Sequence, residues 1–600
     1  MRYVVTTLVL TSDRLAEILR DMATRGGAAH VVTTRVEKGG KVYQTHLLRR
    51  TYREGGKVKN ETLANLSHLP APALDAVRRI LRGEELAPVG EAFEITRTLP
   101  HGDVHAVQVA MQRLGFASLL SSRPCREARL VAGMVAARIV APHTKLATTR
   151  WWKGSTLAED LDIVDATEDD LYAAMDWLLR RQKHIEKKLA ARHLAEGSLV
   201  LYDLSSSYFE GKTCPLAKLG HNRDGKDGKL QVNYGLLADK RGCPIAVSVF
   251  DGATGDPKTL MPQVLKLRQD FGIGSVVLVG DRGMLSQKTV DQLRKTDGLE
   301  WITALKSTQI RSLVESGHVQ LGLFDERNLF ELAHPDFPGE RLVACRNVEL
   351  GRLRAHKRTA LLDATSRELE KIRGMVERGR LSGEAEIGVR VGRVINKYKV
   401  AKHFDLTITA ASFSFQVREE TVAAEAALDG LYIVRTSLPK ERMSADDAVR
   451  NYKSLSNVER AFRTMKSVDL KIRPIHHRLA DRVRAHIFLC MLAYYVEWHM
   501  REAWRPILFA DEDQAAKALR DPVAPAIRSP HADKKPKTLT LADGTPVHSF
   551  RTLMQNLSTL ARNTCRAPSA GKDGPTFQVI TTASALQRRA LDLLVKGIAA

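Results

Sequence analysis

Two short apolar runs, LVLYD at 199–203 and VVLVGD at 276–281, decide the fold of this chain. Each run has the length and the Val and Leu content of a buried β-strand, and each ends in a carboxylate, Asp203 or Asp281. The residues between and after the two runs continue the pattern and end in an alternation of helices and strands. The predicted elements are strands at 199–203, 231–238, 244–250, 275–280 and 300–305, and helices at 258–271 and 286–296.

The order of these elements predicts an α/β fold. Three consecutive strands followed by alternating helices and strands indicate a ribonuclease-H-like layout. In such a sheet the first and fourth strands are neighbours, so Asp203 and Asp281 can approach each other where ligand sites lie, at the carboxyl ends of strands. Carboxylate oxygens suit a hard cation such as Mg²⁺ or Mn²⁺, and two such ions support phosphodiester displacement. Either aspartate alone is also an ordinary turn residue, so a third carboxylate is needed to define a site.

The stretch NYKSLSNVERAFRTMK at 451–466 supplies a third carboxylate, Glu459. Tyr452, Glu459 and Lys466 recur every seven residues, which turns an α-helix by about 700°, about 20° short of two turns. If one helix covers the stretch, the three side chains share a face. Ser456 and Glu459 also match a capping box, in which Glu459 would mark the start of the helix. We predict that Glu459 completes a metal-binding triad with the two aspartates.

Charge and cysteine content narrow the class of protein. Hydrophobic residues make up 44% of the 600 residues, and the net charge is +23 with a pI near 9.8. A chain this basic is typical of a protein that meets a polyanion, with nucleic acid favoured over a merely basic enzyme. The six cysteines form no C-x-x-C pair, which argues against a zinc finger or a disulfide framework and fits a reducing cytoplasm. We find no convincing signal peptide and no run of about 18 apolar residues, so we expect no membrane segment.

The flanking segments predict several further regions. Alternating residues and Gly-Gly turns from 31 to 63 indicate a basic β-meander, and residues 1–30 are expected to be an N-terminal extension. Alternation within 397–419 predicts a β-rich insertion in the core. The predicted regions are 1–66, basic β-meander with possible DNA contact; 67–197, helical and DNA-binding; 198–305 and 431–500, the two parts of the core; 306–430, the β-rich insertion; and 501–600, helical, with a linker at 521–543.

Two other features have competing interpretations. His476, His477 and His486 lie near the predicted active helix, but their basic surroundings favour polar packing or phosphate contact over metal binding. The loop GHNRDGKDGK at 220–229 lacks the G-x₄-G-K-[ST] pattern of a P-loop. We expect it to be a mobile connection, with contact to a DNA backbone as a second role.

Four motifs together resemble a known family. They are D-L-S-S-S-Y at 203–208, G-D-R-G-M at 280–284, Y-x₂-L-x₃-E-x₆-K at 452–466, and the run R-P-I-H-H-R-L-A-D-R-V-R-A-H-I-F-L-C-M-L-A-Y at 473–494. The set is similar to the DDE-type insertion-sequence transposases and, more narrowly, to the insertion-sequence-four superfamily with its Y-R-E-K signature. The resemblance covers roughly residues 198–500.

This resemblance implies roles for the matching residues. Asp203, Asp281 and Glu459 would bind the catalytic ions, which are Mg²⁺, with Mn²⁺ as a substitute, and two per site. Tyr452 and Lys466 would contact DNA phosphates beside the scissile bond. The resemblance further implies DNA as partner, both the terminal inverted repeats of an element and the target, and a homodimer in the DNA complex.

One position departs from the family pattern. The family arginine of the third motif is Leu455 here, and Arg460 and Arg463 are the alternative DNA-binding residues, although neither has the family spacing. Any step that needs that arginine, such as a DNA hairpin intermediate, is therefore left open.

The sequence predicts an enzyme that hydrolyses the phosphodiester at an element end and transfers the freed strand to target DNA. A tyrosine recombinase is disfavoured, because His548-x-x-Arg551 has no tyrosine after it and His46-x-x-Arg49 is followed too closely by Tyr52. Two alternatives remain. One is a transposase-derived DNA-binding protein without catalysis, and the other is a metal-dependent DNA nuclease.

Overall fold

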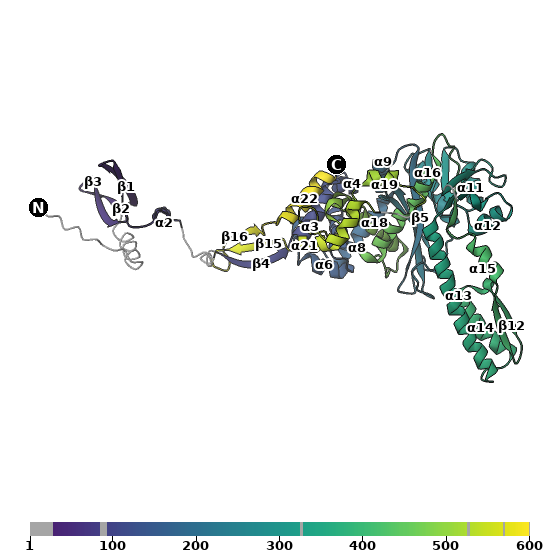
Figure 1. Ribbon diagram of the computed structural model, residues 1–600. Helices are drawn as coiled ribbons and strands as arrows, with labels where there is room; N and C mark the ends of the chain where they lie inside the picture. Colours follow the sequence, from purple (N-terminus) through teal and green to yellow (C-terminus); the bar gives the residue numbers. More distant parts are fainter. Residues whose placement is uncertain (1–27, 85–92, 325–327, 525–527, 568–570, 599–600) are drawn as a thin grey trace. The chain divides into compact units, whose positions relative to one another are not determined.

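The computed structural model describes residues 28–84, 93–324, 328–524, 528–567 and 571–598 (Figure 1). Residues 1–27, most of the expected N-terminal extension, lie outside this part. The chain forms two units: Met1–Thr98 with Asn563–Val579, and Leu99–Arg562 with Ile580–Ala600. None of the helices described is long and apolar enough to cross a bilayer.

The first unit contains the predicted β-meander. Strands β1 (Ala28–Lys38), β2 (Lys41–Glu54) and β3 (Lys57–Asn65) form an antiparallel sheet in that order. The two Gly-Gly turns that join them have positive φ, which glycine adopts without strain. Helix α2 (Ala71–Leu81) buries Leu74 beside Leu48 of β2 in a small separate core.

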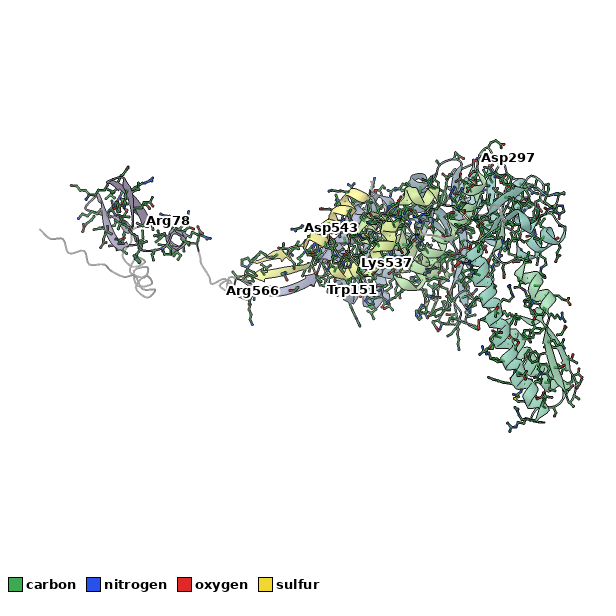
Figure 2. The ribbon with its side chains drawn as sticks, in the orientation of Figure 1. Arg78, Trp151, Asp297, Lys537, Asp543 and Arg566 are labelled. Atoms are coloured by element: carbon green, nitrogen blue, oxygen red, sulfur yellow. The ribbon has the colours of Figure 1, made fainter. Side chains whose placement is uncertain are left out.

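A second sheet in this unit joins distant parts of the sequence. It has the order β16-β15-β4, formed by β4 (Glu94–Pro100), β15 (Ala561–Arg566) and β16 (Thr576–Ile580). Arg566, labelled in Figure 2, pairs with Glu94. The prediction that 501–600 is helical is therefore wrong for 561–566 and 576–580. Likewise, the predicted helical region 67–197 includes β4.

The second unit is built on a mixed sheet with the order β10-β11-β14-β9-β8-β5-β6-β7. Its strands are β5 (Ser198–Tyr208), β6 (Gln231–Asp239), β7 (Pro244–Asp251), β8 (Val276–Val279), β9 (Leu299–Ala304), β10 (Leu329–Leu332), β11 (Arg341–Arg346) and β14 (Leu431–Thr436). Strand β5 is antiparallel to β6 and parallel to β8, and β8 is parallel to β9. The predicted strands from 199 to 305 are all present, and the first and fourth are neighbours as expected.

Helices cover this sheet and share its core. A capping box at Thr167 begins α8, and the helical stretch is divided at Arg181 into α8 and α9. Trp152 is fully buried in the shared core. The covering helices are α3 (Gly102–Arg113), α4 (Phe116–Leu120), α5 (Arg126–Val140), α6 (Lys145–Trp152), α7 (Leu157–Asp160), α8 (Glu168–Arg180), α9 (Gln182–His193), α10 (Pro257–Leu265), α11 (Gln287–Arg294), α18 (Ala480–Ala503), α21 (Phe550–Leu557) and α22 (Ala585–Gly597).

The segment 306–430 is mainly helical, so the predicted β-rich insertion is wrong. Its largest elements are α13 (Val348–Glu377) and α14 (Glu384–Tyr398), whose apolar residues recur at helical spacing and form a core of their own. The alternation seen in the sequence belongs to one short hairpin, and β10 and β11 extend the main sheet. The remaining elements are α12 (Ser307–Glu315), β12 (Phe404–Ile408), β13 (Phe413–Val417) and α15 (Glu419–Ala426).

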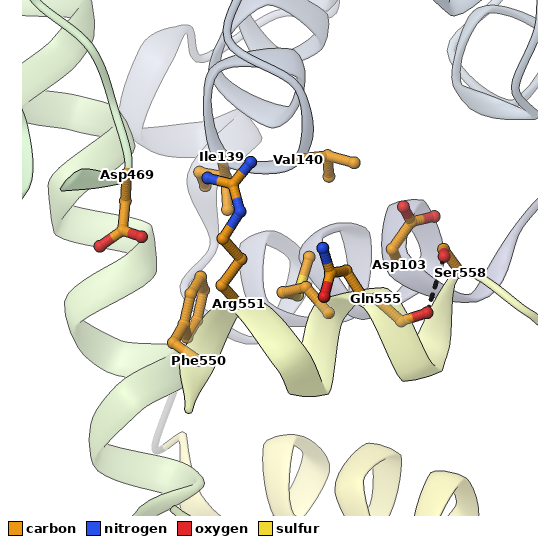
Figure 3. Close-up of a pocket in the computed structure, with 9 residues that line it drawn as sticks. Asp103, Ile139, Val140, Asp469, Phe550, Arg551, Gln555 and Ser558 are labelled. Carbon is orange, nitrogen blue, oxygen red and sulfur yellow. Dashed lines mark hydrogen bonds between the residues drawn. The ribbon is translucent and has the colours of Figure 1, made fainter. Parts of the chain in front are cut away.

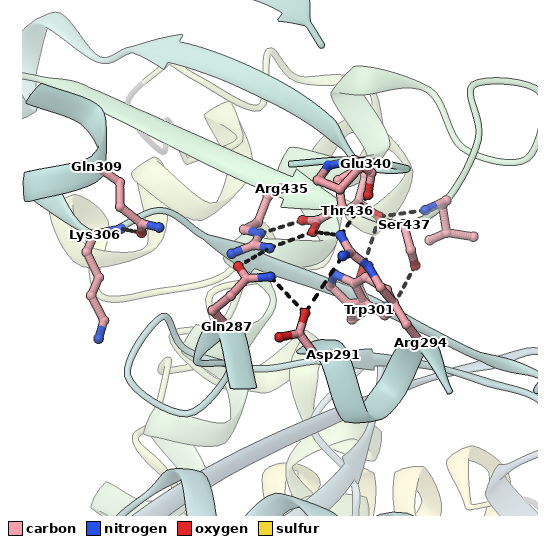
Figure 4. A network of polar contacts seen from close by, with 12 residues as sticks. Gln287, Asp291, Arg294, Trp301, Lys306, Gln309, Glu340, Arg435, Thr436 and Ser437 are labelled. Carbon is pink, nitrogen blue, oxygen red and sulfur yellow. Dashed lines mark hydrogen bonds and ion pairs between the residues drawn. The ribbon is translucent and has the colours of Figure 1, made fainter. Parts of the chain in front are cut away.

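A buried ion pair fixes these outer strands. Arg435 of β14 donates to both carboxylate oxygens of Glu340, at 2.5 and 2.6 Å, and Glu340 also pairs with Arg294 of α11 (Figure 4). Both partners of the central pair are buried. Because an unpaired buried charge is costly, this network holds β11, β14 and α11 in one arrangement.

The predicted linker 521–543 contains helix α20 (Pro530–Thr538). Ser529 caps the helix and Pro530 occupies its first turn, where a missing N–H costs nothing. The buried Lys535 ammonium donates to the backbone carbonyls of Arg505, Leu508 and Ala510. Residues 530–538 of the predicted linker therefore form a packed helix.

Candidate active site

The structure brings the three predicted carboxylates to one edge of the main sheet. Leu201 of β5 is the partner of Val279 in β8, so Asp203 and Asp281 each lie two residues beyond a paired position. Residues two apart in a strand share a face, which places both aspartates where β5 and β8 separate. Glu459 comes from α17 (Leu455–Arg463), which packs on β5. Asp281 and Glu459 are exposed and Asp203 is partly buried.

Asp203 does not end its strand as predicted. Strand β5 continues to Tyr208 against β6, and Ser205, Ser206 and Ser207 are buried there. A polar S-S-S run gives no sequence signal for a buried strand, which is why the boundary was misplaced.

The pKa of the Asp203 carboxyl is raised by burial and by the neighbouring carboxylates. Burial raises the pKa of this carboxyl to about 7, and the charges of Asp281 and Glu459 add to the rise. The backbone N–H of Leu204, which donates at 2.8 Å, and the Arg223 guanidinium act in the opposite direction. Clustered carboxylates that disfavour one another's ionisation are the donor set expected for a hard divalent cation.

The fit to a cation has a geometric limit. Among the described residues, three ligand atoms within 4.8 Å of one another are found at His193, Cys243 and His499, and not at the carboxylates. The three carboxylates are therefore not a preformed three-ligand site for one ion in this structure.

The stretch 451–466 is not one helix, so the predicted shared face is wrong. Helix α16 (Ala445–Lys453) ends before Ser454, α17 follows, and a π-helical turn, η4 (Thr464–Val468), completes the stretch. Tyr452, Glu459 and Lys466 therefore lie on three different elements. The capping box at Ser456 is also absent, because α17 begins at Leu455 with Ser454 as its N-cap residue. Capping does not compete for the Glu459 carboxylate.

Tyr452 and Leu455, two other positions of the third motif, have different surroundings. Burial raises the pKa of the Tyr452 hydroxyl, and the charges of Asp281, Glu459 and Asp203 raise it further. Tyr452 is thus close to all three carboxylates. Leu455, where the related motif has arginine, is buried in the core at the start of α17.

Lys466 lies inside the protein rather than on its surface. Its ammonium is 2.9 Å from Asp224, whose carboxylate also pairs with Arg473 at 2.5 Å and accepts from the Tyr208 N–H at 3.0 Å. Burial lowers the pKa of Lys466. In this arrangement the Lys466 ammonium is paired with the Asp224 carboxylate.

Arg460 and Arg463 extend from α17 beside Glu459. Both side chains are exposed. Their position leaves them available to a polyanion that approaches the carboxylates.

Two residues of the loop 220–229 were not predicted to belong to the site. Arg223 pairs with Asp256 at 2.5 Å and accounts for the positive charge near Asp203. Asp224 anchors Lys466 as described above. The loop is therefore tied down at these residues, and the expectation of a mobile connection is wrong for them. The basic, Gly-rich composition of the loop was the only sign of a role in the sequence. It could not indicate these contacts, because Asp256 and Lys466 lie on distant elements.

Two of the three histidines, His477 and His486, pack with their neighbours, whereas His476 is exposed. The rings of His477 and His486 are 5.1 Å apart, and the His486 Nε2 is 3.1 Å from the Ile472 carbonyl. Burial lowers the pKa of His477 to about 3. Neutral, packed imidazoles agree with the predicted packing role.

A small cavity of about 130 Å³ lies away from these residues (Figure 3). It is lined by Asp103 of α3, Val140 of α5 and Arg551 of α21, among others, and by none of the three carboxylates. It is a gap between packed helices.

Comparison with known proteins places the chain in a family. The model of the family "Transposase DDE domain" matches residues 201–496, which contain all three carboxylates. A second model, "IS1634 family transposase, N-terminal domain", matches residues 31–88. The chain therefore belongs to the DDE transposases of insertion sequences. Membership in this family implies DNA binding, nuclease or transposase activity, and use of divalent metal in general.

Solved structures also match, among them one with weak similarity. It is titled "Cryo-EM structure of piggyBac transposase synaptic complex with hairpin DNA (SNHP)" and has 9% sequence identity and a TM-score of 0.32. The match covers 76% of this chain and 77% of that chain. A comparison with curated protein sequences gives no match.

Proposed function

We propose that this DNA transposase cuts the phosphodiester at the end of its insertion sequence and joins the freed 3′ end to target DNA. The observation that supports this most directly is the convergence of Asp203, Asp281 and Glu459 from β5, β8 and α17. The family match at residues 201–496 includes all three carboxylates.

The catalytic core is ribonuclease-H-like in this proposal. Along β7-β6-β5-β8-β9 the strand order is third, second, first, fourth and fifth in chain sequence. The first three strands are antiparallel and the last two run parallel to the first. This is the arrangement expected from the order of elements in the sequence, and it sets Asp203 beside Asp281.

The three carboxylates would hold two Mg²⁺ ions, with Mn²⁺ as a substitute. Bound there, divalent ions activate an attacking oxygen and stabilise the leaving oxygen of a phosphodiester. Water attacks the bond at the element end first, and the freed 3′ hydroxyl then attacks target DNA in the same site. Neither step needs a covalent bond between protein and DNA.

Other residues of this site would position the DNA. Tyr452 lies beside the carboxylates, and the exposed Arg460 and Arg463 would contact phosphates. Lys466 would reach DNA only by leaving Asp224, so its role in the proposal is to fix η4 against the loop 220–229.

Recognition of the terminal inverted repeats is assigned to the first unit. The family N-terminal domain matches 31–88, and the β-meander carries exposed basic residues. Two ends must be joined in one reaction, so a homodimer in the DNA complex belongs to the proposal.

Glu459→Gln tests the catalytic assignment. The change removes a charge but keeps the shape of the side chain. We expect cleavage of a DNA end in Mg²⁺ to fall by several orders of magnitude, as for loss of a group that binds catalytic metal, while DNA affinity stays within a few-fold. Glu441→Gln, an exposed carboxylate on the turn before α16, is the matched control and should keep full activity.

The same assay separates the alternatives. Retained cleavage by the Glu459→Gln variant would remove Glu459 from the site. A wild-type protein that cuts DNA but never joins the 3′ end to a target would be a nuclease. One that binds the ends in Mg²⁺ or Mn²⁺ without cutting would be a DNA-binding protein derived from a transposase.

A further inference from the structure

Three potential metal ligands meet at the β6–β7 turn. This turn follows Asp239, which pairs with Val200 near the start of β5, so the cluster lies toward the opposite end of that strand from Asp203. His193 is the last residue of α9, Cys243 lies in the turn between β6 and β7, and His499 lies on α18. The Cys243 Sγ is 3.9 Å from the His193 Nε2 and 3.8 Å from the His499 Nε2. All three ligand atoms lie within 4.8 Å of one another.

The thiol is held in place by its own turn. The Asp239 carboxylate accepts hydrogen bonds from the backbone N–H groups of Arg241 at 2.8 Å and Cys243 at 2.9 Å. Cys243 is buried, and both histidines are partly buried. These hydrogen bonds fix the backbone of the turn, so the buried thiol faces the two imidazoles from a rigid position.

The distances are close to those of a tetrahedral metal site. Bonds of 2.3 Å to sulfur and about 2.0–2.1 Å to nitrogen, at a tetrahedral angle, give a sulfur to nitrogen distance of about 3.5 Å. The two observed distances exceed this value by only a few tenths of an ångström, which small side-chain rotations supply. Thiolate and imidazole together are ligands of Zn²⁺ and related borderline metals, and not of Mg²⁺.

Charged groups of both signs lie near the three side chains. Arg192 and Arg241 are nearby positive charges that oppose a cation, and Asp239 offsets them.

Packing without a metal is the competing explanation. Tyr495 and Trp498 contact the His499 ring, with centroids 4.8 and 4.9 Å away, and the Tyr495 hydroxyl is 3.2 Å from the His193 Nε2. Aromatic contacts of this kind account for the ring positions. They do not account for two imidazole nitrogens directed at one thiol.

We propose that His193, Cys243 and His499 bind one Zn²⁺ ion. Its fourth ligand would be water from the adjoining cavity of about 550 Å³, which His193, Asp239 and Arg241 line. On binding, the thiol proton passes to solvent and a sulfur–zinc bond forms, with no change of oxidation state. The ion would join α9, the β6–β7 turn and α18, so its role is to stabilise the covering helices on the sheet.

Metal content of the full chain, purified without a histidine tag, tests this site. We expect about one Zn²⁺ per chain, retained on dialysis against a weak chelator, and near zero in Cys243→Ser. Replacement by Co²⁺ should give a sulfur-to-cobalt charge-transfer band in the near ultraviolet, which carboxylate ligands cannot produce. Cys345→Ser, at another buried cysteine, is the matched control and should keep both signals.

The outcome is independent of the proposed transposition chemistry. Glu459→Gln should keep the zinc and the cobalt band while it loses DNA cleavage. A wild-type chain that shows no cobalt band, or a Cys243→Ser variant that keeps it, overturns the proposal. Should Cys243→Ser prevent folding, His499→Gln provides the same comparison, and the wild-type spectrum alone still decides.

Discussion

Asp203, Asp281 and Glu459 are chemically similar residues in different environments. Asp203 is partly buried with a pKa of about 7, whereas the other two carboxylates are exposed. Near neutral pH a proton therefore competes with any cation for Asp203. The exposed pair gives the site access to solvent and substrate, and the buried member is the one whose charge most needs compensation.

Glu497 of α18 is a buried carboxylate outside the candidate site. Its Oε1 accepts from the Arg501 Nε at 2.6 Å, and Arg501 also pairs with Asp469. Burial raises the pKa of Glu497 to about 7 despite the arginine, with Asp469 adding to the rise. Between its ordinary pKa and pH 7, the folded protein holds a proton that the unfolded chain has released. Stability therefore falls as the pH rises through that window.

Glu497→Gln should remove this part of the pH dependence. We expect the wild-type melting temperature to fall more between pH 5 and pH 7.5 than that of the variant, corresponding to roughly 2–3 kcal/mol. Thermal denaturation monitored across this pH range measures the difference. Asp203 contributes the same slope to both proteins, so it cancels, and Glu441→Gln serves as the exposed control. Parallel curves for wild type and variant would contradict the assignment.

At the residue scale, the three carboxylates could be picked out from the sequence, whereas the charged residues that pair near them could not. Asp203 and Asp281 follow apolar runs that any buried strand would show, and Glu459 stands in a recognisable motif. Arg223 and Asp224 have no such pattern, because their partners come from elsewhere in the chain. Contacts between a loop and a distant helix leave no periodic trace in the sequence.

At the scale of elements, strands could be predicted more reliably than helix ends. The breaks at Arg181 and Ser454 interrupt stretches whose composition is helical throughout. Neither break contains the Gly or Pro that would announce it. The helices that follow the breaks, α9 and α17, pack on β7 and β5, and such contacts leave no pattern in the sequence.

The helical hairpin of α13 and α14 should unfold independently of the main sheet. Leu369 is fully buried in the separate core of this segment, whereas Leu353 on the same helix is 67% exposed. Leu369→Ala should destabilise the hairpin by about 2–5 kcal/mol through lost contacts and a cavity. Limited proteolysis should show faster cleavage within 348–417, with the main sheet still protected.

Leu353→Ala is the matched control for the same helix. Its cleavage rate should equal that of the wild type. Global unfolding of the Leu369→Ala variant in a single step would show that the hairpin core is not independent of the rest.

At the scale of the whole molecule, the division into two units determines which truncations are informative. Residues 99–193 form part of the same core as the main sheet, so deletion of everything before 195 would expose that core. Deletion of residues 1–84 removes β1, β2, β3 and α2 but keeps β4 with β15 and β16.

The 1–84 deletion should abolish discrimination between element ends and unrelated DNA. We expect residual binding to both, because basic residues remain in the second unit, and residual metal-dependent nicking without end preference. Competition binding with end and non-end duplexes at one fixed salt concentration measures the ratio. Equal loss of specific and non-specific binding would contradict the assignment of end recognition to the first unit.

The sheet formed by β4, β15 and β16 has a consequence for synthesis of the chain. Thr96 donates to the Thr564 carbonyl across 468 residues of sequence. At about 5–20 residues per second, β4 waits roughly 20–90 s on the ribosome for its partner strand. During that time it presents unpaired backbone groups, and a product truncated before residue 561 never covers them. Only a chain that extends past residue 580 can complete this sheet.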